Sequence, residues 1–225
     1  MLFGNKERYV VRTLGDSVLR AKAAVIPAVT PEIRALAERM IRAMRVFDGI
    51  GLAAPQIGES LRLAVIEIPQ DAMEKDPTPG EALLYPRMPL VLINPQILER
   101  SSDLAVRDEG CLSLPDIYAP VVRPARVVLD SDILDGGHVT VECGGLLGRC
   151  IQHELDHLDG VVFSDRVLPE DRALIAPDLR RLEKYGAKHH FQRVITARST
   201  FPPAGRGTWR NANTAGKANW EYWEY

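Results

Sequence analysis

Two histidines four residues apart are the feature of this sequence with the clearest chemical meaning. The stretch IQHELDHLDG (residues 151–160) contains His153 and His157, with Glu154 directly after the first histidine. On a helix, these two imidazoles project from the same face, one turn apart, and can bind one metal ion. Glu154 then lies beside the ion, where its carboxylate can handle a proton. The pattern predicts a metal site rather than two histidines that are satisfied by ordinary hydrogen bonds.

A catalytic site of this kind usually has three protein ligands, so a third ligand is required. One group of zinc proteases places a third histidine six residues after the second, but Phe163 occupies that position here. Glu170 and Glu183 lie downstream, and neither belongs to a second recognisable motif. The upstream stretch RDEGCLSLP contains Cys111 among charged and small residues. A cysteine alone is more often a small buried hydrophobe, but beside two histidines its thiolate is the natural third ligand.

A third stretch, GIGLAAPQIG (residues 49–58), has a backbone that a ligand can approach closely, because it contains three glycines and two alanines. Its spacing is not that of a dinucleotide-binding loop, since Ala54 stands where the third glycine would be and no strand leads into it. The alternative is a tight turn between a helix and a strand. Gln56 is the exception in this stretch, because its amide could donate a hydrogen bond to a substrate oxygen.

The elements that must position these residues follow from hydrophobic spacing and from capping residues. Residues 30–49 are typical of a helix with Thr30 as its cap and Pro31 in its first turn. Residues 61–69 and 90–98 are short apolar runs that predict strands, and the proline-rich stretch 70–89 between them predicts a surface loop. The apolar positions of the first helix form one stripe: Ile33, Leu36, Ala37, Met40, Ile41, Met44 and Phe47.

The site-bearing segment lies between a hairpin and a further helix. Residues 125–143 carry two apolar runs around a Gly-Gly pair, which predicts a β-hairpin. The next segment is typical of a helix that ends at Gly160, and a further helix is expected over residues 170–188 with an interruption at Pro177. The site helix has one apolar face: Leu147, Cys150, Ile151, Leu155 and Leu158. Strands followed by a site-bearing helix indicate an α+β fold, with strands around a central helix and an amphipathic helix near the N-terminus.

Composition indicates a soluble globular protein. The 225 residues are 46% hydrophobic and 26% charged, with a formal net charge of −2, which gives no reason to propose DNA or an anionic membrane as a partner. Three cysteines and the lack of a secretory signal predict a cytoplasmic protein. No apolar run is long enough to cross a membrane. We expect a catalytic domain over residues 1–190 and a C-terminal extension, rich in small and polar residues, over residues 191–225.

Taken together, GIGLAAPQ, EGCLS and HELDH resemble, in this order, the three signature motifs of the peptide deformylase family. The resemblance extends over about residues 9–168 and includes LINP and the residues around the histidines. It implies an α+β fold with strands around the helix that carries the histidines. It also implies a metal-dependent hydrolase that removes the formyl group from the N-terminal formylmethionine of nascent polypeptides.

The resemblance further implies a role for each matched residue. Cys111, His153 and His157 would hold one divalent metal ion, with a water as fourth ligand that attacks the formyl carbon. Fe2+ is the first choice of metal, and Zn2+, Ni2+ and Co2+ are alternatives. The other matched residues divide into catalytic and substrate-binding groups: Glu154 as general base, Gln56 and the backbone N–H of Leu112 as oxyanion donors, Gly51 and Gly110 as main-chain partners of the peptide, and Ile50 and Cys150 in the methionine pocket.

Two competing interpretations and one possible partner remain at this stage. A metallopeptidase could use the same histidine pair, although Phe163 and the complete EGCLS stretch argue against it. A non-enzymatic metal-binding relative is disfavoured because Glu154 and Gln56 are both present. The basic segment over residues 178–193 is a candidate for docking on the ribosome.

Overall fold

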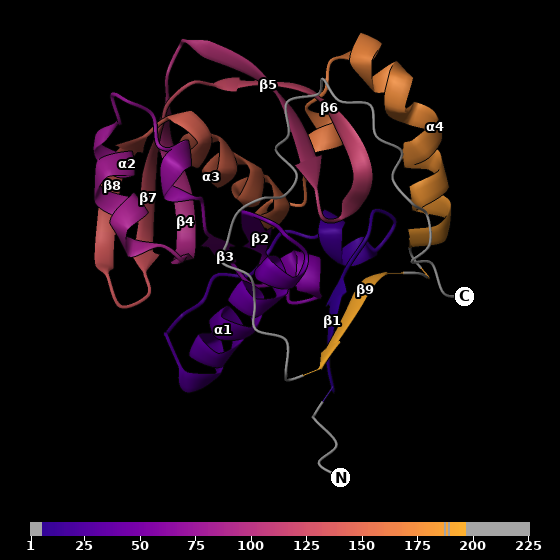
Figure 1. Cartoon of the computed structure of the whole chain (residues 1–225), viewed down its shortest axis with the longest axis horizontal. Coiled ribbons are helices and arrows are strands. Elements are labelled where there is room, and N and C mark those ends of the chain that lie inside the picture. The colour runs from indigo at the N-terminus through magenta and orange to yellow at the C-terminus, as the bar shows by residue number, and fades with distance from the viewer. Residues whose placement is uncertain (1–5, 187, 189, 197–225) are drawn as a thin grey trace.

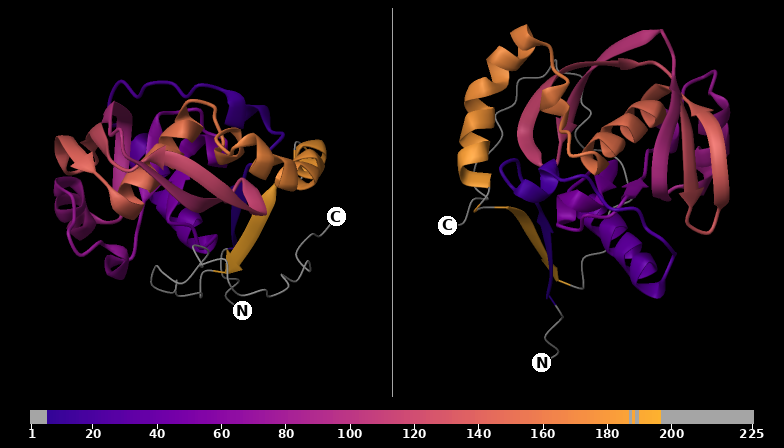
Figure 2. Two further views of the ribbon diagram at one scale, coloured as in Figure 1. Left: turned by 90° about the horizontal axis from the view of Figure 1, so that it is seen from above. Right: turned by 180° about the vertical axis from the view of Figure 1, so that it is seen from behind.

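The computed structural model describes residues 6–186, 188 and 190–196 and has an α+β fold (Figure 1). The helices are α1 (Pro31–Val46), α2 (Pro79–Leu84), α3 (Gly145–Leu158) and α4 (Pro169–Gly186). The strands are β1 (Lys6–Val11), β2 (Gly51–Ala53), β3 (Leu63–Ile66), β4 (Leu90–Arg100), β5 (Leu104–Cys111), β6 (Leu114–Pro124), β7 (Val127–Ile133), β8 (Gly137–Cys143) and β9 (Phe191–Thr196). Figures 1 and 2 both show α3 between the large sheet and the β5–β6 ribbon.

The large sheet is antiparallel and has the strand order β2-β3-β4-β7-β8. Successive side chains of β3 and β4 point to opposite faces of the sheet, and both faces are buried. Leu63 and Val65 of β3 pack with α1, whereas Ala64 and Ile66 pack with α3. Because both faces are covered, the strand sequences are apolar without interruption, which is why the runs at 61–69 and 90–98 predict strands. β4 alternates in the same way, with Val91 and Ile93 on the first face and Leu90 and Leu92 on the second.

Helix α1 begins where its capping signals predict. The side chain of Thr30 accepts a hydrogen bond from the backbone N–H of Ile33, and Pro31 occupies the first turn. Met40 and Met44 are fully buried against the sheet. The chain then turns directly into β2, so the helix end and the Gly-rich stretch lie beside α3.

Strands β5 and β6 form a separate two-stranded ribbon, and α4 packs on β6 (Figure 1). Leu179 and Leu182 of α4 are buried in a cluster that includes Val121 of β6. The helix runs from residue 169 to 186 through Pro177, where the sequence predicts an interruption. Pro177 has no backbone N–H to donate to the carbonyl oxygen of Ala173, four residues earlier. Because Ala173 is exposed, water can bond to this oxygen instead.

The stretch over residues 70–89 is not a plain surface loop, so that prediction is wrong in part. It contains α2, whose N-terminus is closed by a capping box between Thr78 and Glu81, with Pro79 in the first turn. Leu84 and Tyr85 are buried beneath the sheet residues of the second face. The capping box explains why a proline-rich segment still forms a helical turn here.

The two ends of the described chain meet at the edge of the molecule. β9 pairs antiparallel with β1, from Lys6 opposite Thr196 to Val11 opposite Phe191, and Figures 1 and 2 show this pair apart from the large sheet. The predicted extension therefore begins with a strand that is bonded to the N-terminal segment. The rest of the predicted extension, residues 197–225, lies outside the described residues, and the division into a domain and an extension stays a prediction.

Candidate metal centre

Cys111, His153 and His157, the three predicted ligands, lie together at the end of β5 and on α3. Each offers one ligand atom, and these atoms lie within 4.8 Å of one another. The two imidazole centroids are 5.1 Å apart, as expected for side chains one helical turn apart. Cys111 Sγ lies 3.1 Å from His157 Nε2. The fold therefore brings together residues that are more than forty positions apart in the sequence.

The β5–β6 ribbon places the cysteine. The pairing register shifts between Gly110 and Cys111, and Cys111 then pairs with Leu114 across a tight turn. The backbone N–H of Ser113 and the Nε2 of Gln56 lie 3.4 and 3.5 Å from Cys111 Sγ. Two N–H groups are thus directed at the sulfur and hold it beside His157.

The two histidines differ in their surroundings. Nδ1 of His153 donates to the carboxylate of Glu109 at 2.9 Å, which leaves Nε2 as the ligand atom. Burial disfavours the charged imidazole of His153, but hydrogen bonds with Cys111 and Glu109 outweigh this and raise its pKa well above the usual value. Burial lowers the pKa of His157 well below its usual value, so its imidazole is neutral. A cation at the cluster would replace the proton on His153 Nε2, since metal ligands must be deprotonated.

The donor set fits a single divalent transition metal. One thiolate and two imidazoles are soft and borderline donors, which suit Zn2+ and Fe2+ and do not suit Mg2+ or Ca2+. All three residues are half-buried or buried. Three protein ligands leave room for a further ligand, as in catalytic rather than structural sites.

Glu154 lies beside the ligand cluster in a site with little access to water. Its side chain is buried, and burial raises its pKa to about 7. Its Oε2 has no hydrogen-bond partner among the described residues. A carboxyl group with this pKa can both accept and release a proton near neutral pH.

Gly51 makes room for that carboxylate. A Cβ atom at this position would lie 2.3 Å from Glu154 Oε1 and 2.8 Å from Cys150 Sγ. Ile50 packs in the same cluster as Cys150, and burial raises the pKa of the Cys150 thiol well above its usual value. Cys150 is thus a buried, neutral side chain, as its place on the apolar face of the helix predicts.

Gln56 is buried and held in one orientation. Its Oε1 accepts a hydrogen bond of 2.7 Å from the N–H of Ala53, and its Nε2 donates to Ser113 Oγ at 3.2 Å. The amide NH2 is therefore turned toward the metal ligands. Leu112 lies in the adjoining turn, and its side chain packs against the α1 core cluster.

Gly110, which the resemblance assigns to peptide binding, immediately precedes Cys111. A Cβ atom there would lie 2.4 Å from the ring of Tyr118, its partner on β6. Because Gly110 has no side chain, there is room for the ring of Tyr118.

Sequence reasoning missed a buried charge network behind the ligands. Glu109 is fully buried and accepts hydrogen bonds from Arg123 Nε at 2.7 Å, from Arg149 Nη1 at 2.7 Å and from His153. Burial alone would favour the neutral acid, but the bonds from Arg123 and His153 hold the pKa of Glu109 well below its usual value. Arg123 also donates to Asp156 at 2.8 Å. The available signal was Glu109 itself, a charged residue two positions before Cys111.

Among the described residues, the fold forms one possible metal site of an enzyme, with Cys111, His153 and His157 as the candidate ligands. Residues 9–173 match the Polypeptide deformylase family. Peptide deformylase 2 of Gloeobacter violaceus is 50% identical over 175 residues, which cover 77% of this chain and 86% of that protein. The chain belongs to the peptide deformylase family, and it is an enzyme that removes the N-formyl group from nascent polypeptides.

Solved structures agree with this assignment. The structure of Arabidopsis thaliana peptide deformylase 1B in complex with an inhibitor matches with a TM-score of 0.66 and 36% identity, over 77% of this chain and 90% of that chain. The Synechococcus elongatus enzyme in complex with actinonin matches with a TM-score of 0.63 and 37% identity, over 78% and 84% of the two chains. In the part of the chain that the structure describes, no helix has both the length and the apolar character of a membrane span.

Proposed function

We propose that Cys111, His153 and His157 hold one divalent metal ion, with Fe2+ as the first choice and Zn2+, Ni2+ and Co2+ as alternatives. The observation that carries this proposal is the convergence of the three ligand atoms within 4.8 Å. When bound, such an ion supplies Lewis acidity that makes water nucleophilic near neutral pH. A thiolate donates more charge than a third imidazole would, so a water bound at this site would be less acidic and a general base would matter more.

Glu154 acts as that base and then as the acid. Its carboxylate accepts a proton from the attacking water and delivers it to the nitrogen of the leaving amine. Support comes from its burial beside Gly51, next to His153 in the sequence, and from a pKa that burial raises to about 7 in the metal-free protein.

Two donors stabilise the oxyanion that develops on the formyl oxygen. They are the Nε2 of Gln56, whose orientation is fixed by the bond from Ala53, and the backbone N–H of Leu112. The backbones of Gly51 and Gly110 offer hydrogen bonds to an extended peptide. Ile50 and Cys150 line the pocket for the methionine side chain, next to the carboxylate of Glu154.

We place the enzyme in the cytoplasm, where formylated chains emerge from the ribosome, and assign ribosome docking to the outer face of α4. That face exposes Arg180, Arg181 and Lys184. Leu179 and Leu182 hold the helix on the domain, so charge-neutralising substitutions test docking without removing the helix. Undiminished ribosome association after replacing all three cations with glutamine would refute this assignment.

The catalytic role of Glu154 is tested by Glu154→Ala in the metal-loaded protein. We expect one bound metal ion per chain and a turnover at least about 100-fold lower, because a positioned general base contributes that much or more. Formate release and metal content are measured on the same sample. Exposed Glu99→Ala is the matched control and should keep full activity. Near-normal turnover in Glu154→Ala would show that another group moves the proton.

A further inference from the structure

A cavity of about 720 Å³ lies beside α3, and none of the three metal ligands lines it. Gln152, Leu155 and Asp156 line it, whereas His153 and His157 project toward Cys111. At 100° per residue, the lining positions and the histidines fall on different faces of the helix. This cavity is therefore separate from the catalytic centre.

An irregular part of β4 opens the cavity. The pairing of β4 with β7 shifts register between Ile93 and Gln96 and again between Ile97 and Glu99. Asn94, inside the first shift, has a φ of 51°. The buried guanidinium of Arg62 supports this bend through a bond of 3.0 Å from its Nη2 to the carbonyl oxygen of Pro95. The bulge bends the strand locally and leaves a hollow between β4, α3 and the segment around residue 22.

The lining is rich in cations, although the whole chain has a formal net charge of −2. Acidic groups already neutralise part of this charge: Arg62 pairs with Asp159 at 2.7 Å, and Arg166 pairs with Asp156 at 2.7 Å. The cationic residues of the lining are Lys22, Arg62, Arg100, Arg123 and Arg166.

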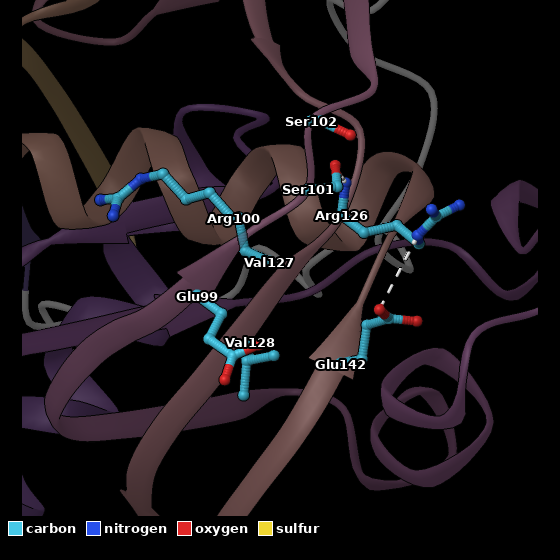
Figure 3. Close-up of a pocket in the computed structure, with 8 residues that line it drawn as sticks. All are labelled: Glu99, Arg100, Ser101, Ser102, Arg126, Val127, Val128 and Glu142. Carbon is cyan, nitrogen blue, oxygen red and sulfur yellow. Dashed lines mark hydrogen bonds and ion pairs between the residues drawn. The ribbon is translucent and has the colours of Figure 1, made fainter.

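Lys22 and Arg100 carry the charge that remains. Both are exposed, and neither has an acidic partner among the residues that the structure describes. Arg100 also borders a smaller hollow, shown in Figure 3, where Arg126 pairs with Glu142 at 3.8 Å. In that view the guanidinium of Arg100 points away from Arg126 and Glu142. Its charge is thus directed to the larger cavity, which it also lines.

We propose that this cavity binds a small phosphorylated molecule, with Lys22 and Arg100 as the ligands of its phosphate. Two unneutralised cations match the charge of a phosphate monoester, and a guanidinium fits phosphate oxygens in a bidentate manner. The volume exceeds that of phosphate alone. Val25 and Ile97 give the lining an apolar part, which suits an organic group on the phosphate.

Arg123 and Asp156 are unsuitable for testing this proposal because they also belong to the network around Glu109. Lys22 and Arg100 are exposed and outside that network, so their substitution to glutamine should leave folding and the metal centre unchanged. Arg87 is an exposed arginine that does not line the cavity, and Arg87→Gln is the matched control.

The experiment titrates the metal-loaded protein with inorganic phosphate and with glycerol 2-phosphate in a phosphate-free buffer and follows backbone amide signals by NMR. We expect saturable shifts at Ala23, Ile97 and Leu155, with glycerol 2-phosphate binding at least as tightly as phosphate. Lys22→Gln and Arg100→Gln should each weaken binding by about tenfold or more, since each removes a charge-assisted contact. Arg87→Gln should change it less than about twofold.

Three results would overturn the proposal. Shifts centred on Cys111 would assign binding to the metal. Equal weakening by all three substitutions, or no weakening by Lys22→Gln and Arg100→Gln, would show that charge acts without a defined site. Binding of a short RNA but of neither small phosphate would assign these cations to a nucleic-acid surface instead.

Discussion

At the scale of single residues, the chemistry depends on groups that burial holds in defined charge states. Glu109 is an anion that accepts hydrogen bonds from arginines and His153, whereas Glu154, which follows His153 in the sequence, has a pKa of about 7. The two carboxyl groups are both buried, but only Glu109 receives charged hydrogen bonds. Hydrogen bonds to its charged form therefore keep Glu109 ionised, so that it can position His153. Glu154 receives no such bonds from the described residues, which suits the proposed role of a proton carrier.

Glu109→Gln should weaken both metal binding and folding. The substitution leaves Arg123 and Arg149 buried with less negative charge nearby and weakens the bond that orients His153. We expect metal affinity to fall by roughly 10- to 100-fold and the free energy of unfolding to fall by about 3–5 kcal/mol. A chelator competition and a urea titration measure the two effects. Exposed Glu99→Gln is the control, and equal metal affinity in both variants would exclude the positioning role.

The raised pKa of Glu154 makes a prediction for metal-free protein. In the folded state this group keeps its proton up to about pH 7, compared with an ordinary value of 4.5. Its contribution to stability is therefore complete below about pH 4.5 and is lost as the pH rises through 7. Relative to wild type, Glu154→Gln should gain about 1.4 kcal/mol of unfolding free energy per pH unit between these values. Denaturant titrations from pH 5 to 8 test this, and a constant difference would contradict it.

At the scale of elements, the site depends on how closely α3 approaches the strands. Gly148 sits in the first turns of α3, and a Cβ atom there would lie 2.6 Å from the carbonyl oxygen of Cys143 at the end of β8. The neighbouring atom belongs to the backbone, so it cannot rotate away. A larger residue must therefore move the helix that carries both histidines.

Gly148→Ala should lower the free energy of unfolding by about 1–3 kcal/mol, as expected for overpacking. It should also reduce metal affinity, because His153 and His157 move relative to Cys111. Thermal unfolding with and without metal measures both effects. A variant with unchanged metal affinity would show that the helix adjusts without shifting the ligands.

Elements with strong local signals were predictable from the sequence, and elements set by tertiary contacts were not. Helix α1 has a cap and an apolar stripe, and β3 and β4 are apolar because both faces of the sheet are buried. Strand β5 has no comparable signal, because residues 106–108 are all exposed and its one buried residue is the charged Glu109. For the site, HELDH predicted two ligands by helical geometry, whereas Cys111 was chosen for its donor chemistry and for the motif resemblance, because spacing alone could not place it.

At the scale of the whole molecule, α3 contributes side chains to two separate sites. The face of α3 with His153 and His157 carries the proposed chemistry, and another face lines the cavity that we assign to a phosphorylated ligand. The network through Arg123, Asp156 and Glu109 connects the two sides. Packing of the sheet against α1 on one side and α3 on the other holds this arrangement in place.

The most direct test is formate release from a short formyl-Met peptide by protein prepared without oxygen and loaded with Fe2+. We predict one metal ion per chain, one formate for each free amino terminus formed and no internal cleavage of the peptide. A chelator should abolish the reaction, and added Fe2+ or Ni2+ should restore it. Internal cleavage, or the absence of formate from protein that holds a full complement of metal, would contradict the assignment of Cys111, His153, His157 and Glu154 as a deformylase centre.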